Sequence, residues 1–155
     1  MKRILFRYKF LLAGLFVVII SCQKMEYTQE FNWAYPMSGE WALQLEYGTH
    51  VDHGPYFVKI YNSSFSRDSV WIDDHGNIWP FKAKVKVDMT ALTFSTTKFK
   101  SRPGTSTEDL VTISKGQIVN KDSIYFEAEF ASDAGTIYKM YGHRASGYDE
   151  YLMPH

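Results

Sequence analysis

Side chains that could carry out hydrolysis are plentiful in this sequence, but their spacing assigns none of them to a catalytic set. A hydrolase needs a nucleophile, a base and an orienting acid within mutual reach. The chain has five histidines and many serines, so Ser-His-Asp combinations can be drawn freely, and it contains no Gly-x-Ser-x-Gly motif. Because a triad is recognised by geometry and not by sequence position, we assign no catalytic residue, and we favour a non-catalytic role.

The one compact group of metal-type ligands is His50-x-Asp52-His53. Zinc would need a third protein ligand from elsewhere in the chain and a constrained geometry. The group lies within residues 48–55, a stretch with two glycines and a proline, which is typical of turns. We therefore expect a solvated loop here, and we predict neither a metal site nor a cofactor.

Two pairs of carboxylates have the residue types of a glycosidase site. Adjacent residues on a strand face opposite sides, so Asp73 and Asp74 should diverge, and the residues after them favour a hairpin loop. Glu127 and Glu129 share a face, about 7 Å apart along a strand. That face is opposite the apolar residues of the same strand, so we expect a solvated surface and no chemistry.

Alternating apolar and polar residues run from residue 39 almost to the C-terminus and predict half-buried β-strands. In the stretch 81–87, Lys82, Lys84 and Lys86 must face water, which fixes the facing of that strand. We predict an all-β fold, an eight-stranded antiparallel barrel whose interior is just wide enough for packed side chains or one small ligand. The predicted strands are 39–47, 56–60, 67–72, 81–87, 92–94, 110–119 with a turn at Lys115-Gly116, 124–130 and 138–144.

The side chains predicted to face the interior form the candidate ligand-binding set. Two alanines among larger residues could leave a cavity, and tyrosine hydroxyls would supply the few polar anchors typical of apolar pockets. Aromatic side chains could equally fill the barrel, and the sequence leaves both alternatives open. The set is Leu43, Leu45, Tyr47, Tyr56, Val58, Phe81, Ala83, Val85, Phe126, Ala128, Tyr138 and Met140.

The first and last predicted strands have features that would close the barrel. If these strands are antiparallel neighbours, Trp41 and Arg144 point inward at the same end. A guanidinium over an indole face contributes about 0.5–2 kcal/mol. Gly39 and Gly142 would let the backbones approach closely where the barrel tapers.

Gly-x-Trp on the first strand, answered by an Arg after the last, resembles the signature of lipocalin and calycin barrels. A closer resemblance, over most of the chain beyond residue 38, is to the family called lipid-binding putative hydrolases. It implies a secreted lipoprotein with a calycin-like barrel, a ligand of the lipid or fatty-acid class, and no assigned catalytic set. Pro80 departs from the polar residue expected there, and predicts a bulge or an edge. The matching runs are GEW at 39–41, VWIDD at 70–74, GNIWPFKAKV at 76–85, DSIYFE at 122–127 and GHR at 142–144.

The N-terminus resembles the signal peptide of a bacterial lipoprotein. Four basic residues precede the apolar run 10–20, which is shorter than the roughly 20 residues that span a bilayer. The run ends at Ser21-Cys22, a lipobox-like sequence, and Cys22 is the only cysteine of the chain. We expect a signal peptide at 1–21, a lipidated N-terminus and tether at 22–38, and a barrel at 39–155. The aromatic second half of the tether could instead fold under the barrel as a plug.

Charge bears on the partners of the exported protein. Without residues 1–21 the chain keeps 13 basic and 17 acidic side chains, a net charge of −4 with His neutral. A mildly acidic domain lacks the basic stripe of nucleic-acid-binding proteins, so nucleic acid is not an expected partner. We expect an outer-membrane lipoprotein, and the run 23–26 loosely resembles a signal for the cell surface.

Three functions follow from these patterns. The leading expectation is a membrane-anchored lipoprotein whose barrel binds a small apolar or amphipathic ligand. The alternative is a non-catalytic surface accessory lipoprotein that binds glycan or protein through outer aromatic residues such as Tyr125 and Tyr141. A third is a weak esterase or glycosidase. The oligomeric state does not follow from the sequence.

Overall fold

The structure is a computed structural model that describes residues 31–101, 109–145 and 147. From Asn32 onward the chain forms one compact unit. The predicted signal peptide, the predicted lipidation site Cys22 and the first part of the predicted tether lie outside the described residues.

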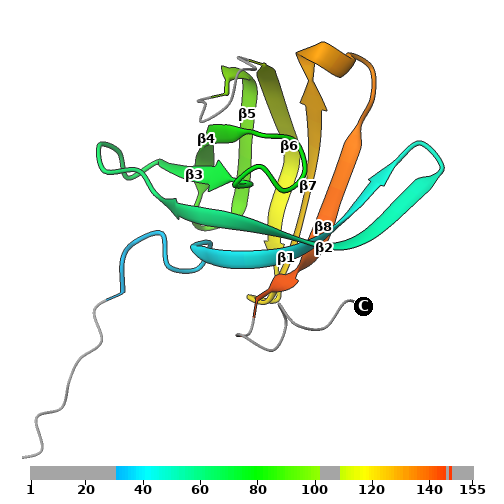
Figure 1. Ribbon diagram of the computed structural model, residues 1–155. Coiled ribbons are helices and arrows are strands. Elements are labelled where there is room, and N and C mark those ends of the chain that lie inside the picture. Colours follow the sequence, from blue (N-terminus) through cyan, green and yellow to red (C-terminus); the bar gives the residue numbers. More distant parts are fainter. Residues whose placement is uncertain (1–30, 102–108, 146, 148–155) are drawn as a thin grey trace, which may run out of the picture. The chain divides into compact units, whose positions relative to one another are not determined.

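Eight antiparallel strands close into a barrel in chain order, each pairing with the next and the last pairing with the first (Figure 1). This confirms the predicted all-β, eight-stranded antiparallel barrel. The described residues include one short 3-10 turn, η1 (Ala131–Asp133), and none of their helical segments is long and apolar enough to cross a membrane. The strands are β1 (Gly39–Tyr47), β2 (His50–Asn62), β3 (Ser69–Asp73), β4 (Lys82–Asp88), β5 (Thr93–Lys100), β6 (Leu110–Val119), β7 (Ser123–Phe130) and β8 (Tyr138–Arg144).

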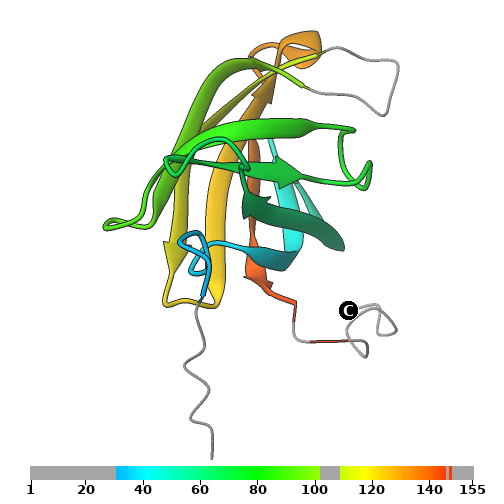
Figure 2. The ribbon, with the colours of Figure 1, turned by 90° about the vertical axis from the view of Figure 1, so that its left-hand side faces the viewer.

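The two ends of the barrel differ. At the end where β1 begins and β8 finishes, residues 33–37 form turns, and Ala34 and Met37 are fully buried. The Trp41 indole donates its Nε1 hydrogen to the Met37 carbonyl oxygen at 3.2 Å. Figure 2 shows this segment in blue beside the start of β1. Residues 32–38 thus plug what we call the closed end. The opposite end is the mouth.

β2 begins at His50, earlier than the predicted start at Tyr56. The loop expected for the His-x-Asp-His group is therefore wrong, because these residues lie on a strand, although both histidines are exposed to solvent as expected. The register with β1 shifts between Leu43 and Leu45. Gly54, with φ +63°, takes up the extra residues, and a Cβ there would lie 2.4 Å from the Leu43 carbonyl oxygen. A glycine is therefore required at position 54 by a β-bulge within the strand and not by a loop.

β6 is one continuous strand, so the predicted turn at Lys115-Gly116 is also wrong. Lys115 has a φ of 51°, and the register of β6 shifts here against both of its neighbours. The Phe94 ring fills the space that a side chain at position 116 would need, since a Cβ there would lie 2.4 Å from the ring. The bulge lets a bulky inward ring fit between two paired strands.

Candidate ligand-binding site

Aromatic side chains gather at the mouth and contact one another. Trp79 stacks on Phe130, with ring centroids 4.9 Å apart and an interplanar angle of 17°. The Tyr138 ring lies 5.8 Å from that of Trp79 and 5.6 Å from that of Phe130, and the Tyr47 ring lies 5.3 Å from that of Tyr138. We call these four residues the mouth cluster. They come from β1, the β3–β4 loop, β7 and β8, so closure of the barrel is what assembles them.

The predicted ligand-binding set lies inside the barrel. Ten of its twelve residues are buried in one apolar cluster, and the other two, Tyr47 and Tyr56, pack against that cluster half-buried. Phe81 meets Phe130 of the mouth cluster at 5.6 Å. The interior is thus a continuous apolar column beneath the aromatic mouth. A ligand-binding role for the set stays a prediction.

Two tyrosine hydroxyls near the mouth donate to carboxylates. The Tyr138 hydroxyl donates to Asp133 at 2.5 Å and the Tyr56 hydroxyl to Asp52 at 2.6 Å. Burial, with the bond to Asp133, raises the pKa of Tyr138 to about 12. The bond to Asp52 raises the pKa of Tyr56, and the same bond lowers the pKa of Asp52. Both phenols therefore keep their protons at neutral pH and direct them at the acids, so what remains on their oxygens is acceptor capacity.

Asp74 accepts most of the side-chain-capped amides of the loop that carries Trp79. Asp74 is 1% exposed and accepts four backbone N–H groups. Its Oδ1 accepts from Gly76 at 2.9 Å and from Phe81 at 3.0 Å, and its Oδ2 accepts from Ile78 at 3.1 Å and from Trp79 at 2.9 Å. Burial raises the pKa of the Asp74 carboxyl, and the four donors oppose that rise. The hairpin role predicted for this residue is thus a specific one, since it fixes the backbone under Trp79.

Two residues of the mouth cluster are absent from the predicted ligand-binding set. Phe130 lies at the end of the predicted strand 124–130, whereas nothing in the sequence analysis placed Trp79 in the interior. It lies in a loop without alternation, so no strand pattern places it inside. The signal available was Asp74 followed by glycine, asparagine and a Trp-Pro pair, which is typical of a side-chain-capped turn. Pro80 lies in the loop directly before β4, so the bulge or edge expected there is not needed and that expectation is wrong. Asp73 accepts from the Tyr61 hydroxyl at 3.0 Å and, among the described residues of the loop, from the His75 N–H alone at 3.1 Å.

The closed end holds the Trp41–Arg144 contact. The Arg144 guanidinium carbon lies 4.4 Å from the centroid of the Trp41 ring, and the two residues are paired in register. The same guanidinium donates to the carbonyl oxygens of Ser38 and, at 3.1 Å, Pro36. It therefore joins the N-terminal turn, the first strand and the last strand.

Two glycines at the closed end lie where a side chain would clash, Gly39 with Arg144 itself and Gly142 with the neighbouring β1 backbone. A Cβ at Gly39 would lie 2.5 Å from Nη1 of Arg144, and a Cβ at Gly142 would lie 1.9 Å from the Ala42 carbonyl oxygen. Gly39 also has a φ of +135°, where side chains are strained. Both positions thus require the absence of a side chain.

The outer face of β7 is less solvated than predicted. Glu127 is only 9% exposed, because the Lys115 Nζ lies 2.9 Å from its carboxylate and the Tyr125 hydroxyl donates to it at 2.7 Å. The solvated surface expected for Glu127 is wrong for this reason. Glu129, half-buried, accepts from the Gly135 N–H at 3.0 Å. Tyr125 is directly opposite Tyr141 of β8, so the two outer aromatic residues of the alternative hypothesis lie side by side.

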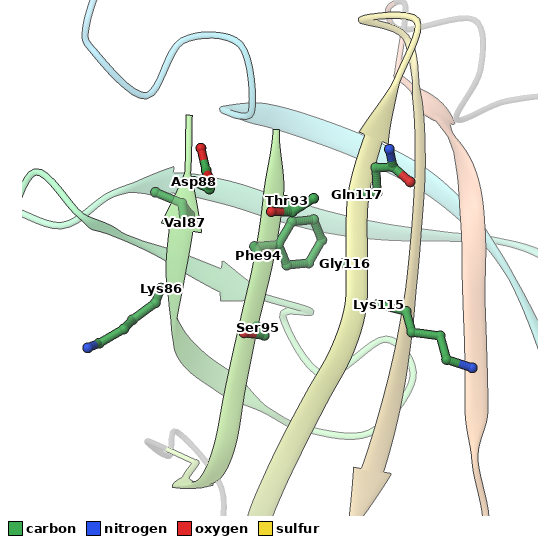
Figure 3. Close-up of a pocket in the computed structure, with 9 residues that line it drawn as sticks. All are labelled: Lys86, Val87, Asp88, Thr93, Phe94, Ser95, Lys115, Gly116 and Gln117. Atoms are coloured by element: carbon green, nitrogen blue, oxygen red, sulfur yellow. The ribbon is translucent and has the colours of Figure 1, made fainter. Parts of the chain in front are cut away.

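A separate open groove of about 540 Å³ lies over β4–β6, near the closed end. Figure 3 shows Lys86 and Lys115 extending away from each other and the Phe94 ring beside Gly116. Since Lys115 is paired with Glu127, the groove does not focus the charge of its two lysines on one point. Its lining residues are Lys86, Val87, Asp88, Thr93, Phe94, Ser95, Lys115, Gly116 and Gln117.

Within the described part of the chain, no three His, Cys, Asp or Glu side chains converge in a way that could hold a metal ion. His50 lies against the Tyr47 ring, with centroids 4.9 Å apart, and Asp52 accepts from Tyr56 and, at 3.3 Å, from the Gly54 N–H. The His-x-Asp-His group is therefore part of the rim around the mouth.

A comparison with protein families adds to this geometry. The model of the family described as lipid-binding putative hydrolase matches residues 26–149, a range that includes all eight strands. The chain belongs to this family. A search of curated proteins found no match. The lipid-binding putative hydrolase family and the closed β-barrel agree with each other, because an apolar interior is what a lipid-binding barrel requires.

Proposed function

We propose that this protein is a membrane-anchored lipoprotein whose barrel binds a small apolar or amphipathic molecule of the lipid or fatty-acid class at the mouth. The observation that carries the proposal is the mouth cluster above a continuous apolar column. Large aromatic faces give an apolar chain extensive contact area, and few polar groups lie near them. The family name supports the same class of ligand.

The polar groups at the mouth favour certain head groups. Tyr56 and Tyr138 direct their protons at Asp52 and Asp133, so the rim offers acceptors and negative charge. A carboxylate anion would meet like charge there, whereas a hydroxyl, an amine or a protonated acid could donate to these oxygens. We therefore expect neutral or cationic amphiphiles, such as fatty alcohols and monoacylglycerols, to bind more tightly than fatty-acid anions of the same chain length.

The anchor is the second part of the proposal. Cys22, the only cysteine, follows a lipobox-like sequence, and two or three acyl chains at about 0.8 kcal/mol per buried methylene would hold the protein at a membrane. We place the protein in the outer membrane, with exposure at the cell surface as the finer expectation. Metabolic labelling with a fatty-acid analogue tests the anchor, since the label should be incorporated by the wild-type protein and be lost in Cys22→Ser.

Extraction tests ligand binding. A chain that starts at residue 23 keeps the closed-end turn and all eight strands. After purification and extraction with organic solvent, mass spectrometry should find a co-purified amphiphile, and adding back a monoacylglycerol should raise the melting temperature. Trp79→Ala should lose the bound molecule, while Phe65→Ala, a change at a fully exposed ring away from the mouth, should keep it.

An empty extract with no thermal stabilisation by any amphiphile would contradict the proposal. That result would favour the accessory lipoprotein that binds glycan or protein, for which the neighbouring Tyr125 and Tyr141 on the outer face are the residues to replace. Turnover of an ester or glycoside that a single substitution abolishes would instead favour a hydrolase.

A further inference from the structure

We infer that the closed end of the barrel is the face that rests on the membrane, with aromatic side chains in the lipid interface and a phospholipid head group in the groove beside Arg67. The inference rests on the lipid anchor proposed above. It concerns the opposite end of the barrel from the proposed ligand site.

The most exposed large apolar side chain of the described residues lies at this end. Phe65 is 96% exposed in the loop between β2 and β3. That loop projects from the closed end, because Ile60, near the end of β2, pairs with Gly39 at the start of β1. Tyr35, in the turn that plugs the same end, is 52% exposed. Exposed aromatic rings beside polar groups are typical of surfaces that meet a membrane interface.

A groove of about 320 Å³ lies between the plug and this loop. The Arg67 guanidinium is exposed and makes no ion pair or hydrogen bond with the residues that the structure describes. Its planar fork matches the oxygens of a phosphate. The hydroxyls of Ser63 and Ser64 can donate to further phosphate or ester oxygens, whereas the Ser66 hydroxyl donates to Asp68. The aromatic walls suit the apolar part of a lipid next to its head group. The groove is lined by Trp33, Asn62, Ser63, Ser64, Phe65, Ser66 and Arg67.

The length of chain between anchor and barrel favours the same face. Cys22 precedes Asn32 by ten positions, which span at most about 35 Å when fully extended. A strand of nine residues rises about 30 Å, and at the usual tilt the barrel is about 20–25 Å tall. Laying the mouth on the membrane would use most of the tether's reach, whereas the closed end needs little of it.

Charge predicts that this contact depends on the anchor. The exported chain has a net charge of −4 with His neutral, so it has no general attraction to anionic lipids. The aromatic rings and Arg67 act locally, once the tether has brought them to the surface. Untethered protein should therefore bind vesicles far more weakly than tethered protein.

Quenching of tryptophan fluorescence by brominated lipids tests the orientation. A chain that starts at Cys22 can be coupled through that thiol to a maleimide lipid in phosphatidylcholine vesicles whose acyl chains are brominated or unmodified. Chemical coupling replaces natural lipidation, so the result does not depend on whether cells modify Cys22. We expect bromine-dependent quenching that is mostly lost in Trp33→Phe, at the closed end, and retained in Trp79→Phe, at the mouth.

A matched pair of surface changes tests the loop itself. Phe65→Ser should reduce the quenching, while Val51→Ser, at an exposed apolar residue on the mouth side of β2, should not. Quenching carried by Trp79 would overturn the inference, because the mouth would then face the bilayer. Absence of quenching in tethered wild-type protein would overturn it too, since the barrel would then stand away from the membrane. Loss of ligand binding would appear in the extraction experiment and leave the quenching unchanged.

Discussion

Arg144 lies over the indole of Trp41, with its guanidinium carbon 4.4 Å from the ring centroid, at the position where the last strand pairs with the first. The Trp41 side chain in this contact is fully inaccessible to solvent. Because the guanidinium also donates to Ser38 and Pro36, one cation of the last strand holds the N-terminal turn and the first strand, which are adjacent to each other and far from Arg144 in the sequence.

Replacing either partner should destabilise the closed barrel. Trp41→Ala removes a large buried side chain, for which a loss of about 3–5 kcal/mol in the free energy of unfolding is typical. Arg144→Ala removes the cation–π contact, which contributes about 0.5–2 kcal/mol, together with its carbonyl contacts. Urea denaturation measures both, with Phe65→Ala as an exposed control. Normal unfolding midpoints in both variants would contradict the role of this pair in closure.

The same substitution, glycine to alanine, should destabilise the protein more at Gly142 than at Gly76. A Cβ at Gly142 would lie 1.9 Å from the Ala42 carbonyl oxygen and 2.9 Å from the Leu43 Cα. These are backbone atoms, so Gly142→Ala should cost at least the roughly 1–3 kcal/mol of an overpacked core. Gly76 has open space and a φ of +80°, so Gly76→Ala should cost about 1–2 kcal/mol from the backbone alone.

Thermal melting should therefore rank wild type, Gly76→Ala and Gly142→Ala in order of falling midpoint. A midpoint for Gly142→Ala no lower than that of Gly76→Ala would contradict this ranking, because the clash with the β1 backbone would then cost no more than backbone strain in an open turn.

Acid stability should depend on Glu127. The hydrogen bond from Tyr125 and the nearby Lys115 ammonium hold the pKa of Glu127 below its ordinary value of 4.5. The stabilisation by the ionised carboxylate is therefore fully present above pH 4.5 and is lost as the pH falls through the lower folded-state pKa. Glu127→Gln should make the decline of stability below this pH shallower.

Tyr125→Phe removes the larger of the two causes and should reproduce part of that effect. The free energy of unfolding, measured by urea denaturation at several acidic pH values, checks both variants. A decline in Glu127→Gln as steep as in the wild type would show that other carboxylates account for the acid sensitivity.

Asp74 should govern the position of Trp79. In Asp74→Ala the four N–H groups lose their acceptor, and each buried donor left without a partner costs about 1–3 kcal/mol. We expect a lower melting temperature and a further loss of ligand stabilisation, because the β3–β4 loop no longer holds Trp79 against Phe130. Asp73→Ala, at the neighbouring carboxylate on the outer side, is the control, and it should leave ligand stabilisation intact. Equal ligand effects in both variants would contradict the link between Asp74 and the mouth.

The parts of the fold that local pattern determines could be predicted from the sequence. The lysine row of β4 fixed which side faces the core, and parity along the last strand placed Arg144 beside Trp41. The two bulges could not be predicted, because Gly54 and Gly116 have the composition of turns. Each glycine is needed because of an atom on another strand. Gly54 lies against the Leu43 carbonyl oxygen, and Gly116 lies against the Phe94 ring.

The burial of the candidate ligand-binding residues could be predicted for the strands and not for the loop. Interior positions such as Phe126 and Met140 follow from alternation, whereas Trp79 reaches the mouth only through the folding of its loop around Asp74. The burial of Glu127 on the outer face could not be predicted from the sequence either. Its burial depends on long side chains from neighbouring positions, Lys115 and Tyr125, which a single-strand pattern does not include.

The carboxylate of Asp74 also has a consequence for hydrogen exchange. The amides of Gly76, Ile78, Trp79 and Phe81 all donate to this one group. A movement of the loop that breaks one of these hydrogen bonds should therefore weaken the others. Their exchange with deuterium should be correlated, as one local opening unit with a shared protection factor. The β3–β4 loop would then open as a whole, and its opening free energy could be measured at any one of these amides.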